Sequence, residues 1–241
     1  MLPIRDTIRS YSFPIVNWIL IGLNSLVFLF ELSLSPLELE RFLMTFGMVP
    51  ARLDFNHPLA LLFNPLPLFT LFSHMFLHGG WFHFLSNMWT LYIFGDNVED
   101  RFGSGRYFIF YILSGVAAGS LQAFLSAGSK VPAIGASGAI AGVLGAYFLL
   151  FPRGRVITLV PLFFVPWFIE IPVIFYLGLW FVTQLYSGLA SLALPATADM
   201  GGVAWFAHIG GFVFGYLFVK LFIPKRHSVY YRSFPDEYWP W

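Results

Sequence analysis

Six long apolar segments divide this chain and constrain its fold more than any other feature of the sequence. Hydrophobic residues make up 58% of the 241 positions and charged residues only 10%, whereas a soluble domain has about 25% charged residues. Each segment reaches or approaches the roughly 20 residues that an α-helix needs to cross a bilayer. The pattern predicts an all-α polytopic membrane protein of one domain with six transmembrane helices. The expected spans are residues 14–34, 81–100, 105–127, 137–152, 171–193 and 202–223.

Positively charged residues are distributed unevenly between the two sides of these spans. If the N-terminus lies in the cytoplasm, ten Lys and Arg residues are cytoplasmic, and only Arg41, Arg52 and Lys130 lie on the opposite side. Because these residues favour cytoplasmic loops, the bias predicts a protein of the cell membrane with both ends inside. We expect a cytoplasmic segment at 1–13, a membrane domain at 14–223 and a cytoplasmic tail at 224–241.

Composition also excludes several kinds of site. The chain has no cysteine, which excludes disulfides, thiolate nucleophiles and zinc–thiolate sites. The formal net charge of +1 gives no indication of a nucleic-acid partner. The first apolar run is too long for the core of a signal peptide and has no small-residue cleavage site, so we expect it to be a retained anchor.

Two connections are unusually apolar for loops. Leucine, phenylalanine and proline dominate residues 35–80, and residues 154–170 on the cytoplasmic side have a similar character. A segment that is too polar to span and too apolar to be free is typical of the membrane interface. We therefore expect a half-embedded first loop and a second interfacial segment on the cytoplasmic side.

A serine between small residues, Gly135-Ala136-Ser137-Gly138, opens the fourth span, and His208 lies in the sixth. Serine and histidine together can carry out nucleophilic acyl transfer, and polar side chains inside a membrane tend to mark functional sites. The 15 residues from Ser137 to Phe151 span about 22 Å of a hydrocarbon core about 30 Å thick, so Ser137 is expected roughly 8 Å below the outer surface. His208 is six residues into its span and about 9 Å deep, so the two side chains can meet.

The position of Ser137 at a helix start has a further consequence. The N–H groups of a first helical turn are unpaired and partly positive, and here they could stabilise the oxyanion of a tetrahedral intermediate. The glycines of the same span (Gly138, Gly142 and Gly145) also fit the small-residue face that membrane helices use for close packing. The motif alone leaves both interpretations open.

Three histidines and an asparagine, His74, His78, His83 and Asn87, precede and enter the second span. His83 and Asn87 share a helix face, so the Asn87 amide is expected level with Ser137, where it could donate to an oxyanion. Interhelical hydrogen bonding is the alternative interpretation. His74 and His78 have the spacing of a zinc pair, but no glutamate lies between them to act as a base, so we expect them to be structural.

Carboxylates are scarce on the outer side of the expected bundle. Only Glu31 and Asp199, at the edges of spans, approach the outer half of the membrane. The sequence therefore predicts a Ser/His dyad rather than a triad, with the imidazole oriented by packing and with slow chemistry.

Three separated motifs occur in a fixed order along nearly the whole chain. They are His74-x3-His78-x4-His83-x3-Asn87, Gly135-Ala136-Ser137-Gly138 and Ala207-His208-x2-Gly211-x3-Gly215, and the stretch from Gly95 to Gly103 adds a fourth similarity after the second span. Together they resemble the rhomboid family of intramembrane serine proteases, of the six-span bacterial type, which implies a rhomboid-like bundle with a short central fourth helix.

The resemblance implies roles for the matching residues. Ser137 would be the nucleophile and His208 the general base, and Asn87, His83 and the Ser137 N–H would form the oxyanion site. Gly211 and Gly215 would let the sixth helix approach the fourth. The resemblance implies transmembrane protein substrates, cut in the bilayer near its outer face, and no cofactor.

One departure from the family pattern bears on the histidine. Some members place a tyrosine one turn after the serine, where it stacks on the imidazole, whereas this chain has Ala141. Another group must therefore hold His208. We expect the fifth span, with Trp180 and Phe181, and residues 194–202 to form a gate, with Gly201-Gly202 either as its hinge or as a simple turn before the sixth helix.

Two other functions are compatible with an apolar bundle. A non-catalytic relative could bind and escort membrane proteins, but the chain retains Ser137, His208 and Asn87. A small transporter could use a helix broken at 131–137, but it predicts two related halves, and the sequence has no internal repeat.

Overall fold

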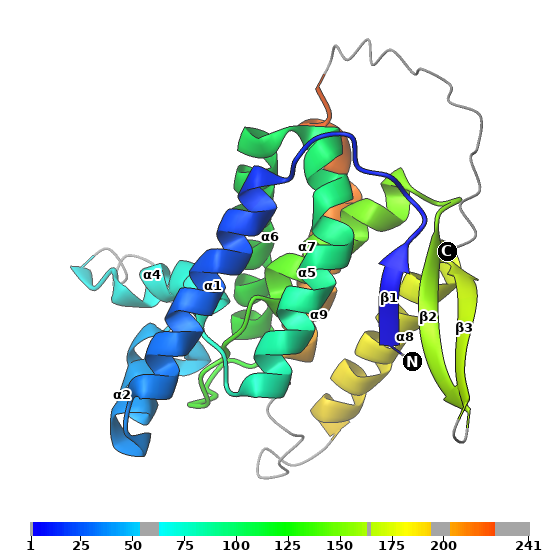
Figure 1. Cartoon of the computed structure of the whole chain (residues 1–241). Helices are drawn as coiled ribbons and strands as arrows, with labels where there is room; N and C mark the ends of the chain where they lie inside the picture. Colours follow the sequence, from blue (N-terminus) through cyan, green and yellow to red (C-terminus); the bar gives the residue numbers. More distant parts are fainter. Residues whose placement is uncertain (1, 54–62, 163–164, 194–202, 225–241) are drawn as a thin grey trace.

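A computed structural model describes residues 2–53, 63–162, 165–193 and 203–224 (Figure 1). Its helices are α1 (Ile15–Ser33), α2 (Pro36–Phe46), α4 (Leu66–Ser73), α5 (Trp81–Phe102), α6 (Ser104–Leu125), α7 (Ser137–Leu150), α8 (Val173–Ala193) and α9 (Trp205–Phe222). Short 3-10 turns lie at η1 (Pro50–Arg52) and η2 (His74–Phe76). The strands are β1 (Leu2–Asp6), β2 (Arg155–Leu162) and β3 (Val165–Pro172).

Helix α7 lies at the centre of the bundle. Every residue from Gly138 to Tyr147 is buried, and the helix packs against α5, α6, α8 and α9. The outer helices instead expose large apolar side chains, such as Leu26 and Leu29 on α1. A bundle that is apolar both inside and outside is suited to lipid as its solvent.

Within the described residues, four helices are long and apolar enough to cross a membrane, namely α1, α6, α8 and α9, so the chain is a multi-pass membrane protein. Helix α5 has 22 residues but carries four charged residues among its last seven. Helix α7 has 14 residues, which span only about 21 Å. The bounds of the six long helices differ from the expected spans by at most three residues, and the crossing of α5 and α7 stays a prediction.

The expectation of an all-α fold is wrong, because the chain also forms a three-stranded antiparallel sheet in the order β1-β2-β3. Residues 154–170, expected as an interfacial loop, are largely the β2–β3 hairpin, in which Val156 pairs with Ile171 and Leu159 with Phe168. Val156 and Thr158 are fully buried, and the residues between and after them are more exposed, as in a strand with one face against a core. Strand β2 pairs with both β1 and β3, so its backbone N–H and C=O groups are hydrogen-bonded within the protein, whereas those of an irregular loop would have to bond water.

The first long connection contains α2, η1, α4 and η2 rather than irregular chain. Ser35 and Glu38 form a capping box at the start of α2, with the Ser35 N–H donating to the Glu38 carboxylate at 2.9 Å. Helix α4 packs against α6 and α2. Residues 54–62 lie outside the described part of the chain, and the embedding of this connection in the membrane stays a prediction.

Acidic residues near the C-terminus of α5 hold the start of α1. The Glu99 carboxylate accepts hydrogen bonds from the backbone N–H groups of Val16 (3.0 Å) and Asn17 (2.7 Å). Asp100 accepts one from the N–H of Ser12 at 2.8 Å. The first turn of a helix has unpaired N–H groups and attracts negative charge, so these carboxylates act as a cap supplied from another helix.

Strand β1 lies between α5 and β2 (Figure 1). The indole N–H of Trp89 on α5 donates to the carbonyl oxygen of Pro3 at 2.6 Å. At the other end of the strand, Asp6 accepts hydrogen bonds from the Asn97 amide at 2.8 Å and from the Tyr147 hydroxyl. The N-terminal segment is therefore part of the folded domain.

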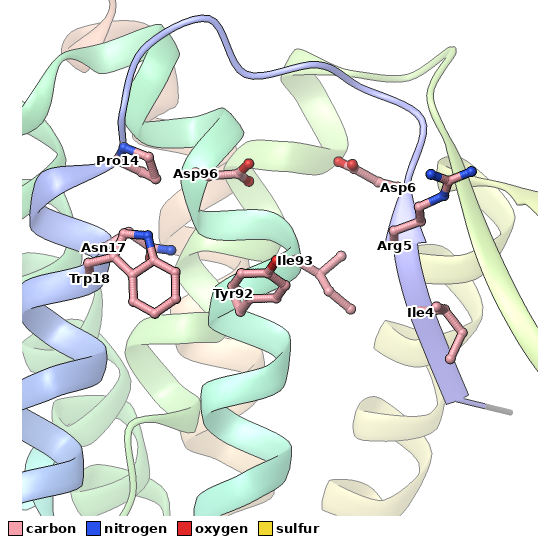
Figure 2. A pocket seen from close by; sticks show the side chains of 9 residues that line it. All are labelled: Ile4, Arg5, Asp6, Pro14, Asn17, Trp18, Tyr92, Ile93 and Asp96. Atoms are coloured by element: carbon pink, nitrogen blue, oxygen red, sulfur yellow. The ribbon is translucent and has the colours of Figure 1, made fainter. Parts of the chain in front are cut away.

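A small cavity separates β1 from α1 and α5 (Figure 2). Figure 2 shows the carboxyl groups of Asp6 and Asp96 facing each other across it. Burial raises the pKa of Asp6 to about 7; the hydrogen bond from Tyr147 opposes this shift, and the neighbouring Asp96 adds to it. The protonation state of Asp6 is thus linked to the docking of β1.

We expect the docking of β1 to weaken as the pH rises. The pKa of Asp6 is higher in the docked state than its ordinary value of 3.8, so the carboxyl favours docking fully below about pH 4, and this contribution is lost as the pH rises through about 7. A nitroxide on Leu2→Cys, in a chain without other cysteines, reports the docking by its electron paramagnetic resonance line shape. The mobile fraction should grow between about pH 4 and about pH 7. In Asp6→Asn the growth should be smaller, because only the Asp96 carboxyl then remains at the cavity; an equal pH response in both proteins would contradict the assignment.

Candidate active site

Ser137 and His208 are directly hydrogen-bonded, with 2.8 Å between Ser137 Oγ and His208 Nε2. Ser137 is the first residue of α7, and His208 lies in the first turn of α9. Both side chains are half-buried. The two residues, 71 positions apart in the sequence, therefore meet at the same end of the bundle, within the reach that a nucleophile and its base require.

Glycines bring the backbones of α7 and α9 together. A Cβ atom added to Gly211 would lie 2.0 Å from the carbonyl oxygen of Gly138, and one on Gly215 would lie 1.9 Å from that of Gly142. A Cβ on Gly145 would lie 2.1 Å from a carbonyl oxygen of α9. The small-residue face of α7 is thus a packing surface, and Ser137 stands at the end of it. The two interpretations of the serine motif are compatible.

The second ring nitrogen of His208 also has a partner. Nδ1 lies 2.7 Å from Oε1 of Gln184, a residue of α8 that is only 6% exposed. Ala141 in place of a tyrosine leaves the imidazole in need of another partner, and Gln184 was not predicted as that partner from the sequence. The available signal was a single amide in the middle of an apolar span, a position where polar side chains are expensive.

Aromatic rings of α8 and α9 lie beside the imidazole. The ring centre of Trp180 lies 5.9 Å from that of His208, and Trp205 approaches edge-on at 6.2 Å. Phe181, also on α8, stacks on Phe212 of α9 at 4.5 Å. Helix α8, the first part of the expected gate, therefore covers His208. The second part, residues 194–202 with Asp199 and Gly201-Gly202, lies outside the described residues.

The chain just before Ser137 is shaped by Gly135. Its φ of +120° lies in a region that side-chain-bearing residues rarely adopt. A Cβ there would lie 2.5 Å from His83 Nε2 and 3.6 Å from Ser137 Oγ. The His83 ring therefore lies against the backbone beside Ser137.

Further hydrogen-bond donors are found on α5 and at the start of α7. Asn87 lies one turn beyond His83 on α5 and is 6% exposed, and its Nδ2 is a buried donor without a partner in the described part of the chain. Such groups are rare in folded proteins and call for an explanation. The first helical bond of α7 runs from Ile140 N to Ala136 O at 3.0 Å, so the N–H groups of residues 137–139 lie outside the helical ladder.

The two remaining histidines of the first motif hold the loop before α5. His74 Nδ1 lies 2.9 Å from the carbonyl oxygen of Thr70, and the His74 carbonyl accepts from the N–H of Gly135 at 2.9 Å. The N–H of His78 lies 3.2 Å from both carboxylate oxygens of Glu31. Burial lowers the pKa of the His78 ring to about 3 and keeps it neutral. Among the described residues, no three side chains of the metal-binding types converge.

Comparison with known proteins gives consistent matches. A family model of the rhomboid domain matches residues 66–225. RHOMBOID-like protein 4 of Arabidopsis thaliana is 34% identical over 176 residues, which cover 68% of this chain and 37% of the relative. Rhomboid protein 1, mitochondrial, of Saccharomyces cerevisiae is 28% identical over 147 residues, or 59% and 38% of the two chains.

A bacterial relative matches a shorter part. Rhomboid protease GluP of Bacillus subtilis is 41% identical over 76 residues, which cover 32% of this chain and 14% of that protein. The matched part of this chain spans less than two fifths of the length of each of these three relatives.

We expect Gly215→Ala to destabilise the protein. Its Cβ would overlap the Gly142 carbonyl, so α7 and α9 must separate, at a cost of about 1–3 kcal/mol in the free energy of unfolding. Gly22→Ala, on the exposed face of α1 with nothing within 4 Å, is the matched control and should be neutral or stabilising by up to about 1 kcal/mol. Reversible unfolding in detergent, followed by tryptophan fluorescence, measures both. Equal stability of the two variants would show that the helix contact tolerates a methyl group.

Proposed function

The chain belongs to the rhomboid family, and we propose that it is an intramembrane serine endopeptidase with Ser137 as nucleophile and His208 as general base. The observation that carries the proposal is the 2.8 Å hydrogen bond between the hydroxyl and the imidazole. Its setting supports the same function, because the pair lies in a bundle whose outer helices are apolar enough to span a membrane. One relative is itself named a protease.

Acylation begins when Ser137 Oγ attacks the carbonyl carbon of the scissile bond. As the new C–O bond forms, the hydroxyl proton passes to His208 Nε2, and the π electrons of the carbonyl move to its oxygen. The intermediate collapses when the C–N bond breaks, and His208 gives the proton to the departing amine. Water then attacks the carbonyl carbon of the acyl-enzyme while His208 takes its proton. The bond from this carbon to Ser137 Oγ breaks, His208 returns the proton to Oγ, and the carboxylic acid product leaves.

The oxyanion of each tetrahedral intermediate needs donors that are already in place. The backbone N–H of Ser137 lies outside the helical ladder of α7, and the buried amide of Asn87 has no other partner among the described residues. The His83 ring lies beside the same stretch of backbone. We assign these three groups to the oxyanion site, where donors fixed in advance stabilise the charge that develops in the transition state.

The substrates are transmembrane segments of other proteins. A carbonyl in an intact helix is already hydrogen-bonded, so the segment must unwind locally, which small and helix-destabilising residues favour. Ser137 lies beside the first turn of α9, at the end of the bundle opposite to Phe222, so we place cleavage near the outer face of the membrane. We place the protein in the cell membrane with both ends in the cytoplasm.

A non-catalytic escort of membrane proteins is the competing function. It would use the same apolar surfaces but would not require a base in contact with a hydroxyl. Covalent chemistry at Ser137 separates the two functions.

We expect a fluorophosphonate probe to label the wild-type protein and not Ser137→Ala. The probe reacts with a serine whose proton is taken by a base, so His208→Ala should also lose labelling. Ser86→Ala is the matched control, because Ser86 is an exposed serine of α5 whose hydroxyl donates to the backbone carbonyl of His83 at 3.0 Å rather than to a base. It should label like wild type. Labelling that persists in Ser137→Ala would identify another nucleophile, and an unlabelled wild type would favour the escort function.

Asn87→Ala should slow cleavage without weakening substrate binding. Loss of one oxyanion donor lowers kcat by about 10²–10³-fold and leaves KM nearly unchanged, because the donor acts in the transition state. The measurement uses a fluorogenic transmembrane peptide, with small residues at its outer end, in proteoliposomes. Asn64→Ala, at an exposed position, is the control and should leave both constants unchanged. A rise in KM at constant kcat would place Asn87 in substrate binding instead.

A further inference from the structure

We propose that Gln184 on α8 is a positioning residue for His208, whose amide oxygen accepts the Nδ1 proton and so fixes the ring for its reaction with Ser137. The inference rests on the proposed function. It identifies the third member of a Ser137–His208–Gln184 chain in a protein whose sequence predicts only two.

Of the two nitrogens of a neutral imidazole, one donates a hydrogen bond and the other accepts one. To take a proton from Ser137, Nε2 must be the acceptor, so the ring proton must lie on Nδ1. A buried N–H needs a partner, and Oε1 of Gln184 lies 2.7 Å away. The contact therefore selects the tautomer in which Nε2 is free to act as a base.

The orientation of the Gln184 amide is itself determined by its neighbours. Its Nε2 lies 3.2 Å from the carbonyl oxygen of Trp180 and 3.1 Å from Oγ1 of Thr183. The Thr183 hydroxyl donates to the same Trp180 carbonyl at 2.6 Å, so its oxygen is available as an acceptor. Both neighbours require the NH₂ group, and the amide oxygen is left to face His208. A reversed amide would place NH₂ against Nδ1 and favour the unproductive tautomer.

A glutamine in this position has different chemistry from a carboxylate. Its amide dipole orients the ring and stabilises the imidazolium only partly, because it carries no full charge. An ionised carboxylate would be costly at a site that is 6% exposed inside the membrane domain. Among the described residues, His83 of α5 is a titratable side chain that interacts electrostatically with His208. The glutamine thus orients the base without placing a charge inside the membrane.

The acceptor comes from a helix that does not carry the reacting atoms. Ser137 and His208 are held together by the glycine contact of α7 with α9, whereas α8 lies at the edge of the bundle with Val182, Thr183 and Tyr186 exposed. A hydrogen bond weakens steeply when its atoms move apart by about 1 Å. The base is therefore correctly oriented only while α8 lies against α9.

The test compares Gln184→Met, Gln184→Glu and a matched control. Methionine keeps the length of the side chain but removes the strong acceptor. We expect it to lower kcat by about 10- to 100-fold, within the contribution of a positioned general base, with KM changed by less than about threefold. Glutamate keeps an acceptor and should restore part of kcat. Because its charge favours the imidazolium, the pH of half-maximal rate should rise by about one unit or more.

Gln122→Met is the control for loss of a partly buried amide beside α9. Gln122 on α6 accepts from the N–H of Ala207 at 3.1 Å, next to His208 in the sequence, but bonds neither ring nitrogen. Its loss should change stability without moving the pH profile. If Gln184→Met and Gln122→Met lower kcat equally and Gln184→Glu shows no shift, Gln184 is only structural and the inference is wrong.

A second measurement does not depend on activity. The ¹⁵N shifts of His208, in protein labelled at histidine, should show the Nδ1-protonated tautomer in wild type and a mixture in Gln184→Met. The same tautomer in both proteins would overturn the inference even if kcat falls. If wild type shows that tautomer but neither reacts with fluorophosphonate nor cleaves the peptide, the proposed function fails while the hydrogen bond stands.

Discussion

The contact of α7 with α9 is the constraint on which the rest of the structure depends. Carbonyl oxygens of one helix occupy the space where side chains of the other would begin, at Gly138 against Gly211 and Gly142 against Gly215. In lipid, such packing replaces the hydrophobic effect as the source of association between helices. Because two backbones meet here, Ser137 and His208 can be hydrogen-bonded although 70 residues separate them.

Much of this arrangement follows from local sequence properties, and the rest depends on contacts between distant segments. Apolar runs predicted the bounds of the long helices to within three residues, because hydropathy is set by each segment alone. The sheet was missed because Leu2–Asp6 becomes a strand only by pairing with residues more than 140 positions later. The motifs named Ser137, His208 and His83, which lie together at the start of α7, and Asn87, whose part in the site stays a prediction.

Gln184 shows where sequence reasoning about the site ends. The need for a group to hold His208 followed from the missing tyrosine at Ala141, but the identity of that group depends on how α8 is rotated against α9. The acidic end of α5 is a similar case. The similarity of residues 95–103 to a family motif did not indicate what the acidic residues do. The structure shows that Glu99 caps α1 and that Asp100 binds the segment before α1.

The β2–β3 hairpin fixes the N-terminal end of α8 in place. The strand pair runs directly into α8, and the N–H of Val173 is bonded to the carbonyl oxygen of Gly154 at 2.9 Å, close to the end of α7. β1 holds the other edge of the sheet against α5. Helix α8 is thus fixed at its N-terminal end, where it joins the hairpin, and any tilt of the helix pivots about that end. A small tilt about that point moves Gln184, 11 residues or about 16 Å along the helix, by a distance proportional to that arm.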